Sequence, residues 1–368
     1  MPLREDERRL LRALKPRLRP FDDEALNAEP TPALLDAAIT PIESFFVRNN
    51  GWLPKLENPK DWTLTVDGEV ERPCVLSLQA LRAFEPVSVT AVLECAGNGR
   101  AGFDPPTDGV QWARGAVGCA HWTGIRLADV LRHAGVKPSA IYTGHHSGDV
   151  QTNGSGAAAI SRGIPIEKAL SPETLLAFTM NGEALPFLHG GPLRLVVPGY
   201  PGSAWQKWLT RIALRDREHD GEKMTGTDYR LPRMPVPPGE PFDERDFEVI
   251  TAMPVNSLIT TPAENFSVRA GSLLHVHGFA WSGRAPVASV TISADGGATW
   301  QPAELEPEGE RFAWRRFTAT LQLDQMGPVS IRAKAADAAG NVQPDEPPWN
   351  PRGYCNHSVH RVAGTVVP

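Results

Sequence analysis

The sequence predicts two domains of different kinds, a mixed α+β domain followed by an all-β sandwich of the immunoglobulin type. Its 368 residues suffice for about two domains whose cores need no disulfide bonds. Strand-like runs and helical patterns mix in the first part of the chain, whereas alternating apolar and polar residues dominate from Met253 onward. We expect a leader over residues 1–44, the α+β domain over residues 45–245 and the sandwich over residues 246–368.

Composition excludes several classes of protein. The formal net charge of −6 gives no reason to expect nucleic acid or an anionic membrane as a partner. No run is long enough to span a bilayer, and the charged residues 7–15 predict an amphipathic surface helix rather than a signal peptide. We therefore expect a cytoplasmic protein. Four scattered cysteines have neither the spacing of a zinc or iron–sulfur cage nor a haem-attachment motif: Cys74, Cys95, Cys119 and Cys355.

The first domain contains both strand and helix signals. Residues 63–70 alternate in polarity and enter an Asp-Gly turn, which predicts a strand. Ser77 is placed to cap a short helix over residues 78–84. Residues 126–134 have apolar side chains at helical spacing, and Gly135 is the expected stop.

A buried strand over residues 89–94 leads directly to Cys95. The cysteine enters a small, glycine-rich turn that ends at Arg100, and we expect this turn to let a large group approach the sulfur. Thiolate is a soft ligand for transition metals, and a nearby cation favours its ionised form. On this stretch alone, a merely buried structural thiol is an equally good interpretation.

The polar loop over residues 144–156 contains two adjacent histidines, His145 and His146. A pair of histidines is consistent with a zinc site. No His-Glu-X-X-His pattern or suitably spaced carboxylate accompanies them, so the sequence does not favour zinc hydrolysis.

Turn and linker signals organise the rest of the chain. Residues 175–180 predict a strand, and Asn181-Gly182 predicts a hairpin turn after it. Prolines over residues 231–242 mark a stiff linker between the domains. His275 and His277 share one face of a strand. That this face is solvated or lies at an interface is a simpler interpretation than a pair of metal ligands. Further strands of the sandwich are expected within residues 273–279, 289–293, 311–323 and 329–335.

Taken together, residues 94–100, 112–118 and 121–127 closely resemble the molybdenum-binding core of the sulfite oxidase family. The resemblance runs from about Phe45 to the C-terminus. It implies that Cys95 is the single protein ligand of a molybdenum held by molybdopterin, a pyranopterin dithiolene. It also implies a dimerisation role for the C-terminal sandwich, and hence a homodimer.

The resemblance also implies which residues bind the cofactor. Residues 45–50 match the family's Phe-X-Val-Arg-Asn-His segment, except that Asn50 stands where the family commonly has histidine. Residues 188–202 and 205–212 match its His-Gly-X-Pro-X-Arg and Lys-Trp-Leu segments, whose donors bind phosphate and ring. The expected cofactor contacts are Phe46, Val47, Arg48, Asn50, Cys95, Asp149, His189, Arg194, Gln206 and Lys207.

The same resemblance implies a substrate pocket. Arg48, Arg100 and Arg352 are expected to converge on the oxygens of a small anion, and Tyr229 to hydrogen-bond the reacting oxygen. Trp112 is expected to form a wall of this pocket. Gly99 stands where animal members of the family have a second arginine. The glycine therefore reduces the positive electrostatic potential of the pocket.

The implied reaction is the two-electron oxidation of sulfite to sulfate with oxygen from water. Because the chain lacks room for a haem domain, we expect no haem and a separate electron acceptor. Oxidation of a sulfane-sulfur compound and reduction of nitrate remain alternatives on the same site. A non-enzymatic scaffold with a degenerate pocket is a further alternative. Such a scaffold would not need Cys95 together with Arg48, Arg194, Lys207 and Arg352.

Overall fold

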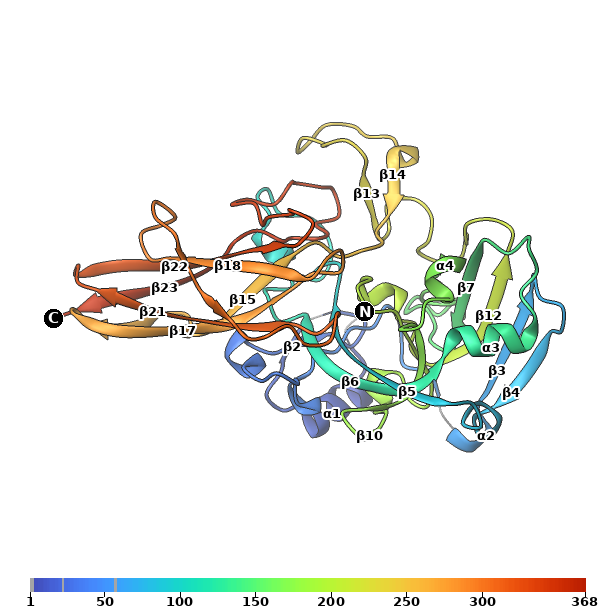
Figure 1. Ribbon diagram of the computed structural model, residues 1–368. Coiled ribbons are helices and arrows are strands. Elements are labelled where there is room, and N and C mark those ends of the chain that lie inside the picture. Colours follow the sequence, from blue (N-terminus) through green and yellow to red (C-terminus); the bar gives the residue numbers. More distant parts are fainter. Residues whose placement is uncertain (1–2, 22, 56–57) are drawn as a thin grey trace.

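The computed structural model describes residues 3–21, 23–55 and 58–368. Figure 1 shows a mixed α+β region joined to a long β-sandwich, with the N-terminal segment lying across both. The predicted fold class, α+β followed by an all-β sandwich, is confirmed. None of the helices in these ranges is both long and apolar enough to cross a membrane.

Two five-stranded sheets form the α+β region in the described part of the chain. The first has the order β10-β9-β6-β5, with β11 also pairing with β9; its strands are β5 (Pro86–Glu94), β6 (Val117–Arg126), β9 (Leu175–Met180), β10 (Glu183–Ala184) and β11 (Arg194–Val196). The second has the order β4-β3-β12-β7-β8; its strands are β3 (Thr63–Gly68), β4 (Cys74–Ser77), β7 (Tyr142–Ser147), β8 (Gly163–Pro165) and β12 (Leu209–Arg215). Pairing is antiparallel except between β3 and β12. One apolar core, which contains Leu93 and Trp122 from the first sheet and Leu64 and Ile212 from the second, joins them.

Short helices cover these sheets: α2 (Leu78–Leu81), α3 (Leu127–Ala134) and α4 (Ile166–Ala169). The side chain of Ser77 accepts a hydrogen bond from the backbone N–H of Ala80, as an N-cap should, and Gly135 ends α3 with a positive φ of 76°. The helix after Ser77 is shorter than predicted. It gives way to a turn at residues 82–83, before Pro86 begins β5.

The hairpin between β9 and β10 is the one that the sequence predicts. Asn181 and Gly182 have φ values of 55° and 81°, and Met180 pairs with Glu183 across the turn. A two-residue turn with positive φ at both positions matches the twist of the strands, which explains the Asn-Gly pair.

The sandwich consists of two facing sheets around a core that includes Val276, Phe317 and Ile331. One sheet has the order β15-β17-β21-β20, with strands β15 (Asn256–Thr261), β17 (Ser272–Trp281), β20 (Glu304–Leu305) and β21 (Arg315–Leu323). The other has the order β16-β23-β22-β18-β19, with strands β16 (Phe266–Arg269), β18 (Val287–Ser293), β19 (Gln301–Pro302), β22 (Gly327–Asp337) and β23 (His360–Val367). Alternate residues of β22 are buried, as the alternating sequence predicts.

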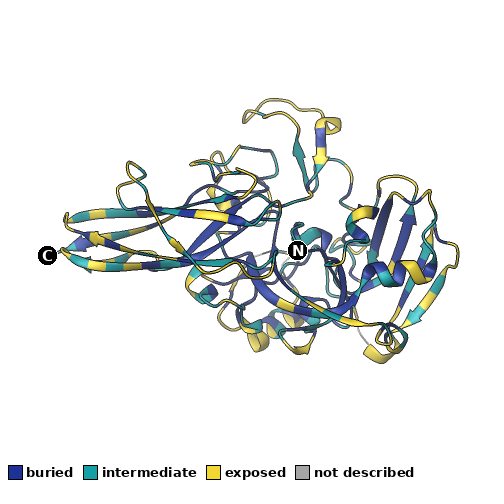
Figure 2. Ribbon diagram, viewed as in Figure 1, coloured by how far each residue is buried: buried dark blue, intermediate teal, exposed yellow. Residues whose placement is uncertain are grey.

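The proline-rich segment contains more structure than a linker. Strands β13 (Arg230–Pro232) and β14 (Phe247–Val249) pair to form a small ribbon, and the loop between them is largely exposed (Figure 2). Proline fits here because this ribbon is two-stranded, so Pro232 has an outer edge that needs no N–H donor.

The N-terminal segment packs on both halves of the molecule. It holds α1 (Glu5–Leu14) and the ribbon strands β1 (Arg19–Pro20) and β2 (Ala28–Glu29). Leu11 of α1 packs with Leu188, while Leu35 packs with Phe279 and Trp314 of the sandwich. Short 3₁₀ helices lie in the connections along the described chain: η1 (Pro32–Leu35), η2 (Ile42–Ser44), η3 (Pro59–Asp61), η4 (Arg100–Gly102), η5 (Phe187–His189), η6 (Gly202–Ala204) and η7 (Glu244–Asp246).

Candidate active site

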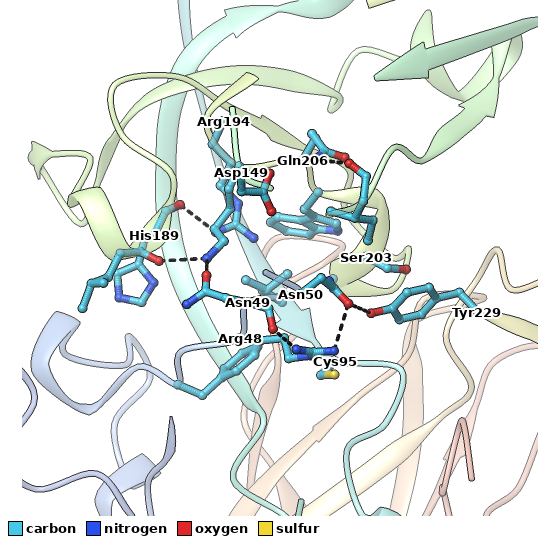
Figure 3. Close-up of a pocket in the computed structure, with 17 residues that line it drawn as sticks. Arg48, Asn49, Asn50, Cys95, Asp149, His189, Arg194, Ser203, Gln206 and Tyr229 are labelled. Atoms are coloured by element: carbon cyan, nitrogen blue, oxygen red, sulfur yellow. Dashed lines mark hydrogen bonds between the residues drawn. The ribbon is translucent and has the colours of Figure 1, made fainter. Parts of the chain in front are cut away.

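Cys95 lies at the point where β5 leaves the core. Its backbone N–H donates to the carbonyl of Ala116 at 2.9 Å, and its carbonyl accepts from the N–H of Asn98 at 2.9 Å, so the turn holds the cysteine from both sides. The residue is 7% exposed and lines two adjoining pockets, an inner and an outer one. Arg48, Asn50 and Tyr229 line both pockets as well (Figure 3).

The inner pocket brings together segments that lie far apart in the sequence. It encloses about 650 Å³, counting the open solvent at its mouth. Its lining consists of Phe46, Arg48, Asn49, Asn50, Leu93, Cys95, Asp149, Ile160, Leu188, His189, Arg194, Gly202, Ser203, Trp205, Gln206, Lys207 and Tyr229.

Positive groups outnumber negative ones in this inner pocket. Arg48, Arg194 and Lys207 face a single carboxylate, Asp149, among the described residues that line it. Burial, and then the charge of Arg194, holds the pKa of Lys207 well below its usual value. Burial lowers the pKa of Arg194 to about 9 and raises that of Asp149. Buried cations without counter-ions are costly, so an anionic group is the natural occupant.

These cations are fixed by the protein. Arg194 donates from Nη1 to the carbonyl of His189 at 2.7 Å, and its guanidinium lies 5.4 Å from the ring centroid of Trp122. Lys207 donates from Nζ to Asn49 Oδ1 and to the carbonyl of Leu188, the latter at 3.2 Å. A rigid set of donors suits a ligand with a defined shape.

Three buried polar atoms in the inner pocket have no hydrogen-bond partner among the described residues: Arg194 Nε, Ser203 Oγ and Gln206 Oε1. Buried polar groups are ordinarily hydrogen-bonded, so these atoms suit a bound ligand that has both donors and acceptors. The amide of Gln206 is oriented by its Nε2, which donates to Ser147 Oγ at 2.6 Å. Together with the surplus of cations, this donor set fits an anionic, heteroatom-rich cofactor such as molybdopterin.

Asn50 connects the two pockets. Its Oδ1 accepts from Arg48 Nη2 at 2.9 Å, from Tyr229 Oη at 3.0 Å and from Lys223 Nζ at 3.2 Å. Although burial opposes it, the nearby Tyr229 and Cys95 raise the pKa of Arg48. One amide oxygen thus gathers three donors beside the thiol.

The outer pocket is larger and more polar. It encloses about 1,250 Å³ including open solvent, and its lining contains four cations, Arg48, Arg100, Lys223 and Arg352, and four carboxylates. Arg352 forms an ion pair with one of these carboxylates, Asp228. The three arginines expected to bind substrate therefore line one cavity.

Glycines near Cys95 make room for Arg100. A Cβ atom on Gly97 would lie 2.6 Å from Arg100 Nη2, and one on Gly109 would lie 2.9 Å from Nη1. The arginine is held there by Nε, which donates to the carbonyl of Arg352 at 3.0 Å. Gly97 and Gly109 thus make room for Arg100, while Cys95 itself lines both pockets.

Tyr229 has a backbone conformation that is rare for a bulky residue, with φ of 52°. Its ring stacks on Tyr354 at 5.4 Å, and the buried guanidinium of Arg162 lies 5.2 Å from the ring centroid. Backbone strain of this kind persists only where the surroundings enforce it, and it concentrates at functional sites.

Two predicted contacts are not brought to the pockets. Within the described residues, neither Val47 nor Trp112 lines the inner or the outer pocket. Val47 follows Phe46 on extended backbone, so its side chain points the other way and packs with Leu188. Trp112 is fully buried behind Phe46, with ring centroids 6.2 Å apart, and supports the pocket rather than forming its wall.

Sequence reasoning missed Asn49, Ser203 and Lys223. Asn49 and Ser203 lie beside recognised motifs, and this position in the sequence is the signal that could have indicated them. Lys223 has a positive φ of 64° and lies in a stretch without a recognisable pattern, so nothing in the sequence indicated it.

The adjacent histidines do not form a metal site. No cluster of three metal-ligating side chains occurs in the part of the chain that the structure describes. His145 is completely buried and hydrogen-bonds through Nε2 to Thr143 Oγ1 at 2.8 Å, and burial lowers its pKa to about 3. His146 packs edge-on against His219. Both histidines are structural.

Two family models match the chain, the oxidoreductase molybdopterin binding domain over residues 50–223 and the Mo-co oxidoreductase dimerisation domain over residues 247–366. Fold and site thus define a molybdopterin-type oxidoreductase. Sulfite oxidase of Gallus gallus is 38% identical over 360 residues, which cover 94% of this chain and 77% of that protein. The chain belongs to the sulfite oxidase family.

Other matches extend this result. Mitochondrial sulfite oxidase of Drosophila melanogaster is 37% identical over 95% of this chain, which spans 63% of that relative's length. The crystal structure of the sulfane dehydrogenase SoxCD from Paracoccus pantotrophus has a TM-score of 0.80 at 26% identity, covering 100% of this chain and 93% of that chain.

Proposed function

We propose that this protein is an enzyme that oxidises sulfite to sulfate at a molybdenum–molybdopterin cofactor bound through Cys95. The observation that carries the proposal is the position of the Cys95 side chain on the boundary between two pockets. The inner pocket offers cations and unpaired polar atoms for an anionic cofactor, and the outer pocket offers arginines for an anionic substrate. A purely structural thiol needs neither pocket.

The inner-pocket residues would hold the cofactor, and thiolate is a suitable soft ligand for its metal. Molybdenum in this cofactor supplies two-electron redox chemistry, and the balanced reaction is SO₃²⁻ + H₂O → SO₄²⁻ + 2 H⁺ + 2 e⁻. The residues proposed to contact the cofactor are Phe46, Arg48, Asn50, Cys95, Asp149, His189, Arg194, Gln206 and Lys207.

The outer-pocket residues would bind the substrate. Arg48, Arg100 and Arg352 supply guanidinium groups for the oxygens of a small anion. Tyr229 places its hydroxyl beside Asn50, at the boundary of the two pockets, where it would donate to the reacting oxygen. Arg100 Nε donates to the backbone carbonyl of Arg352, so the side chain of one of these arginines lies against the backbone of another.

Electrons would leave to a separate acceptor, and the sandwich would pair with a second copy of itself. The match of residues 247–366 to a dimerisation domain supports the homodimer. Analytical ultracentrifugation tests it, since a monomer at micromolar concentration would contradict it. The cytoplasmic location stays a prediction.

The test of function combines metal analysis with sulfite-dependent reduction of ferricyanide. Wild type, Cys95→Ser and Cys74→Ser are purified from a host that makes the cofactor; Cys74 lies on β4, outside both pockets. We expect about one molybdenum per chain and sulfite activity in wild type and Cys74→Ser, with both lost in Cys95→Ser. Wild type without molybdenum would contradict the proposal and leave a scaffold role.

Oxidation of a sulfane-sulfur compound is the second candidate, because SoxCD resembles the chain over its whole length. The same preparation is therefore assayed with sulfite and with a sulfane donor, and with nitrate as an oxidant. If the molybdenum-loaded protein does not oxidise sulfite but reacts with the sulfane donor or with nitrate, that compound is the substrate instead.

A further inference from the structure

Lys15 is a buried lysine that no motif of the sequence singled out. It follows α1 directly, outside the residues that the molybdopterin-domain family matches, and is only 3% exposed. Its Nζ lies 2.8 Å from His189 Nε2 and 3.1 Å from the carbonyl of Phe45, and it also contacts the carbonyl of Ile42. In Figure 3 the N-terminal ribbon passes beside His189, which lines the inner pocket.

These contacts use every hydrogen of an ammonium group. Two are donated to carbonyls, which accept only, and the third to His189 Nε2. When Lys15 is charged, the ring nitrogen that accepts from it carries no proton, which places the proton of the neutral imidazole on Nδ1. Burial, followed by the charges of Lys15 and Arg194, keeps the pKa of His189 well below its usual value, which agrees with a neutral ring.

The ring of His189 is also held from the side. Phe45 packs against it edge-to-face, with centroids 5.4 Å apart and planes at 76°. Phe45 and Lys15 thus fix the ring through a π contact and a hydrogen bond. Both residues precede position 50, where the match to the molybdopterin-domain family begins.

An ammonium group in this environment is unfavourable by itself. Burial lowers the pKa of Lys15 to about 7, and Glu43 opposes this only in part. Arg194 and Lys207 act on the same histidine, so three cations surround it. An anion bound in the inner pocket would relieve this repulsion, which explains why three cations are grouped around His189.

We propose that Lys15 is a positioning residue of the cofactor site, which holds His189 in one orientation and one tautomer and adds a cation toward the anionic end of the cofactor. The proposal rests on the proposed function, because it needs the inner pocket to bind molybdopterin. It makes the N-terminal segment part of the site, although the match to the molybdopterin-binding domain model, residues 50–223, does not include it.

The experiment compares wild type, Lys15→Met and Arg12→Met, all full length. Arg12→Met is the matched control, since it removes a positive charge from the exposed face of the same helix. Molybdenum is measured by mass spectrometry, and pterin by fluorescence of its oxidised form, before and after extended dialysis. We expect Lys15→Met to retain about tenfold less of both, as is typical when a residue that orients a ligand is removed, and Arg12→Met to match wild type.

Cofactor-free protein from a host unable to make molybdopterin separates positioning from folding. We expect Lys15→Met to melt no lower than wild type in this form, because methionine removes a buried charge. Equal pterin retention in all three proteins would overturn the proposal, as would a loss that follows a lower melting temperature of the cofactor-free variant. Wild type that carries neither pterin nor molybdenum would instead refute the proposed function itself.

Discussion

Trp281 donates a hydrogen bond from Nε1 to Glu94 Oε2 at 2.8 Å, so a side chain of the sandwich holds the residue that immediately precedes Cys95. The other oxygen of Glu94 accepts from Asn98 at 3.0 Å and from Asn256 at 3.2 Å. The carboxylate is 3% exposed, and burial raises its pKa. The C-terminal half of the molecule therefore helps to position the cysteine turn.

Trp281→Phe tests this connection. The substitution keeps an aromatic ring but leaves the buried Glu94 without one of its donors, which should lower the free energy of unfolding by about 1–3 kcal/mol. Urea denaturation followed by circular dichroism measures the change. Trp300→Phe is the control, because it loses a comparable bond, to the carbonyl of Gly297, in a loop away from Cys95. Equal effects of both variants on molybdenum content would contradict a role for Trp281 at the cysteine turn.

Local features were the part of the fold that sequence predicted well. The strand at residues 175–180, the Asn181-Gly182 turn and the Gly135 stop depend on neighbouring residues, and the structure confirms them. The bond from Trp281 to Glu94 spans 187 positions and the contact of Lys15 with His189 spans 174. Pairs at such separation depend on tertiary packing, about which hydrophobic periodicity carries no information.

The candidate site was predicted from resemblance to a family rather than from spacing. Cys95 alone was equally well explained as a buried thiol, and the resemblance of residues 94–100, 112–118 and 121–127 to a molybdenum-binding core indicated a cofactor. Details of side-chain placement depend on tertiary geometry. Val47 belongs to the expected segment but packs with Leu188 rather than lining a pocket, and Gly97 makes room for Arg100.

Gly97→Ala should weaken substrate binding through Arg100. The added Cβ would lie 2.6 Å from Nη2, and the guanidinium cannot move aside without losing its bonds to the carbonyls of Arg352 and Val110. Loss of one such charged bond, about 1.5–3 kcal/mol, predicts a KM for sulfite raised about tenfold or more. Steady-state kinetics normalised to molybdenum content measures it. Gly309→Ala is the control, because no heavy atom of the described residues lies within 4 Å of the place that its new Cβ would take, and equal KM values in both variants would contradict the prediction.

Asn50→Asp should weaken anion binding without removing the hydrogen bonds at that position. A carboxylate still accepts from Arg48, Tyr229 and Lys223, but it adds a negative charge between the two pockets. We expect the KM for sulfite to rise about fivefold to thirtyfold, since roughly 1–2 kcal/mol of repulsion is typical of partly screened charges at this range. Asn153→Asp, on an exposed loop, adds the same charge as a control. A KM that is unchanged at Asn50 but raised at Asn153 would argue against the outer pocket as the anion site.

Stability of the cofactor-free protein should depend on pH through Lys15. Its pKa is about 7 in the folded protein and 10.5 in the unfolded chain, because burial disfavours the charged form. Between these values the unfolded state binds one more proton than the folded state, so the free energy of unfolding rises with pH. Below about pH 7 both states are protonated, and the penalty for the buried charge is complete.

The measurement is the difference in unfolding free energy between wild type and Lys15→Met, followed from pH 6 to about pH 9.5. Subtracting the variant removes the contributions of groups that titrate equally in both proteins. We expect a flat difference below about pH 7 and then a gain for wild type of at most roughly 1.4 kcal/mol per pH unit. Glu43 and His189 face Lys15, and His189, whose pKa burial holds well below its usual value, stays neutral over this range and leaves the slope unchanged. A difference that falls with pH, or stays flat to pH 9.5, would mean that Lys15 is not buried as a near-neutral amine in the cofactor-free protein.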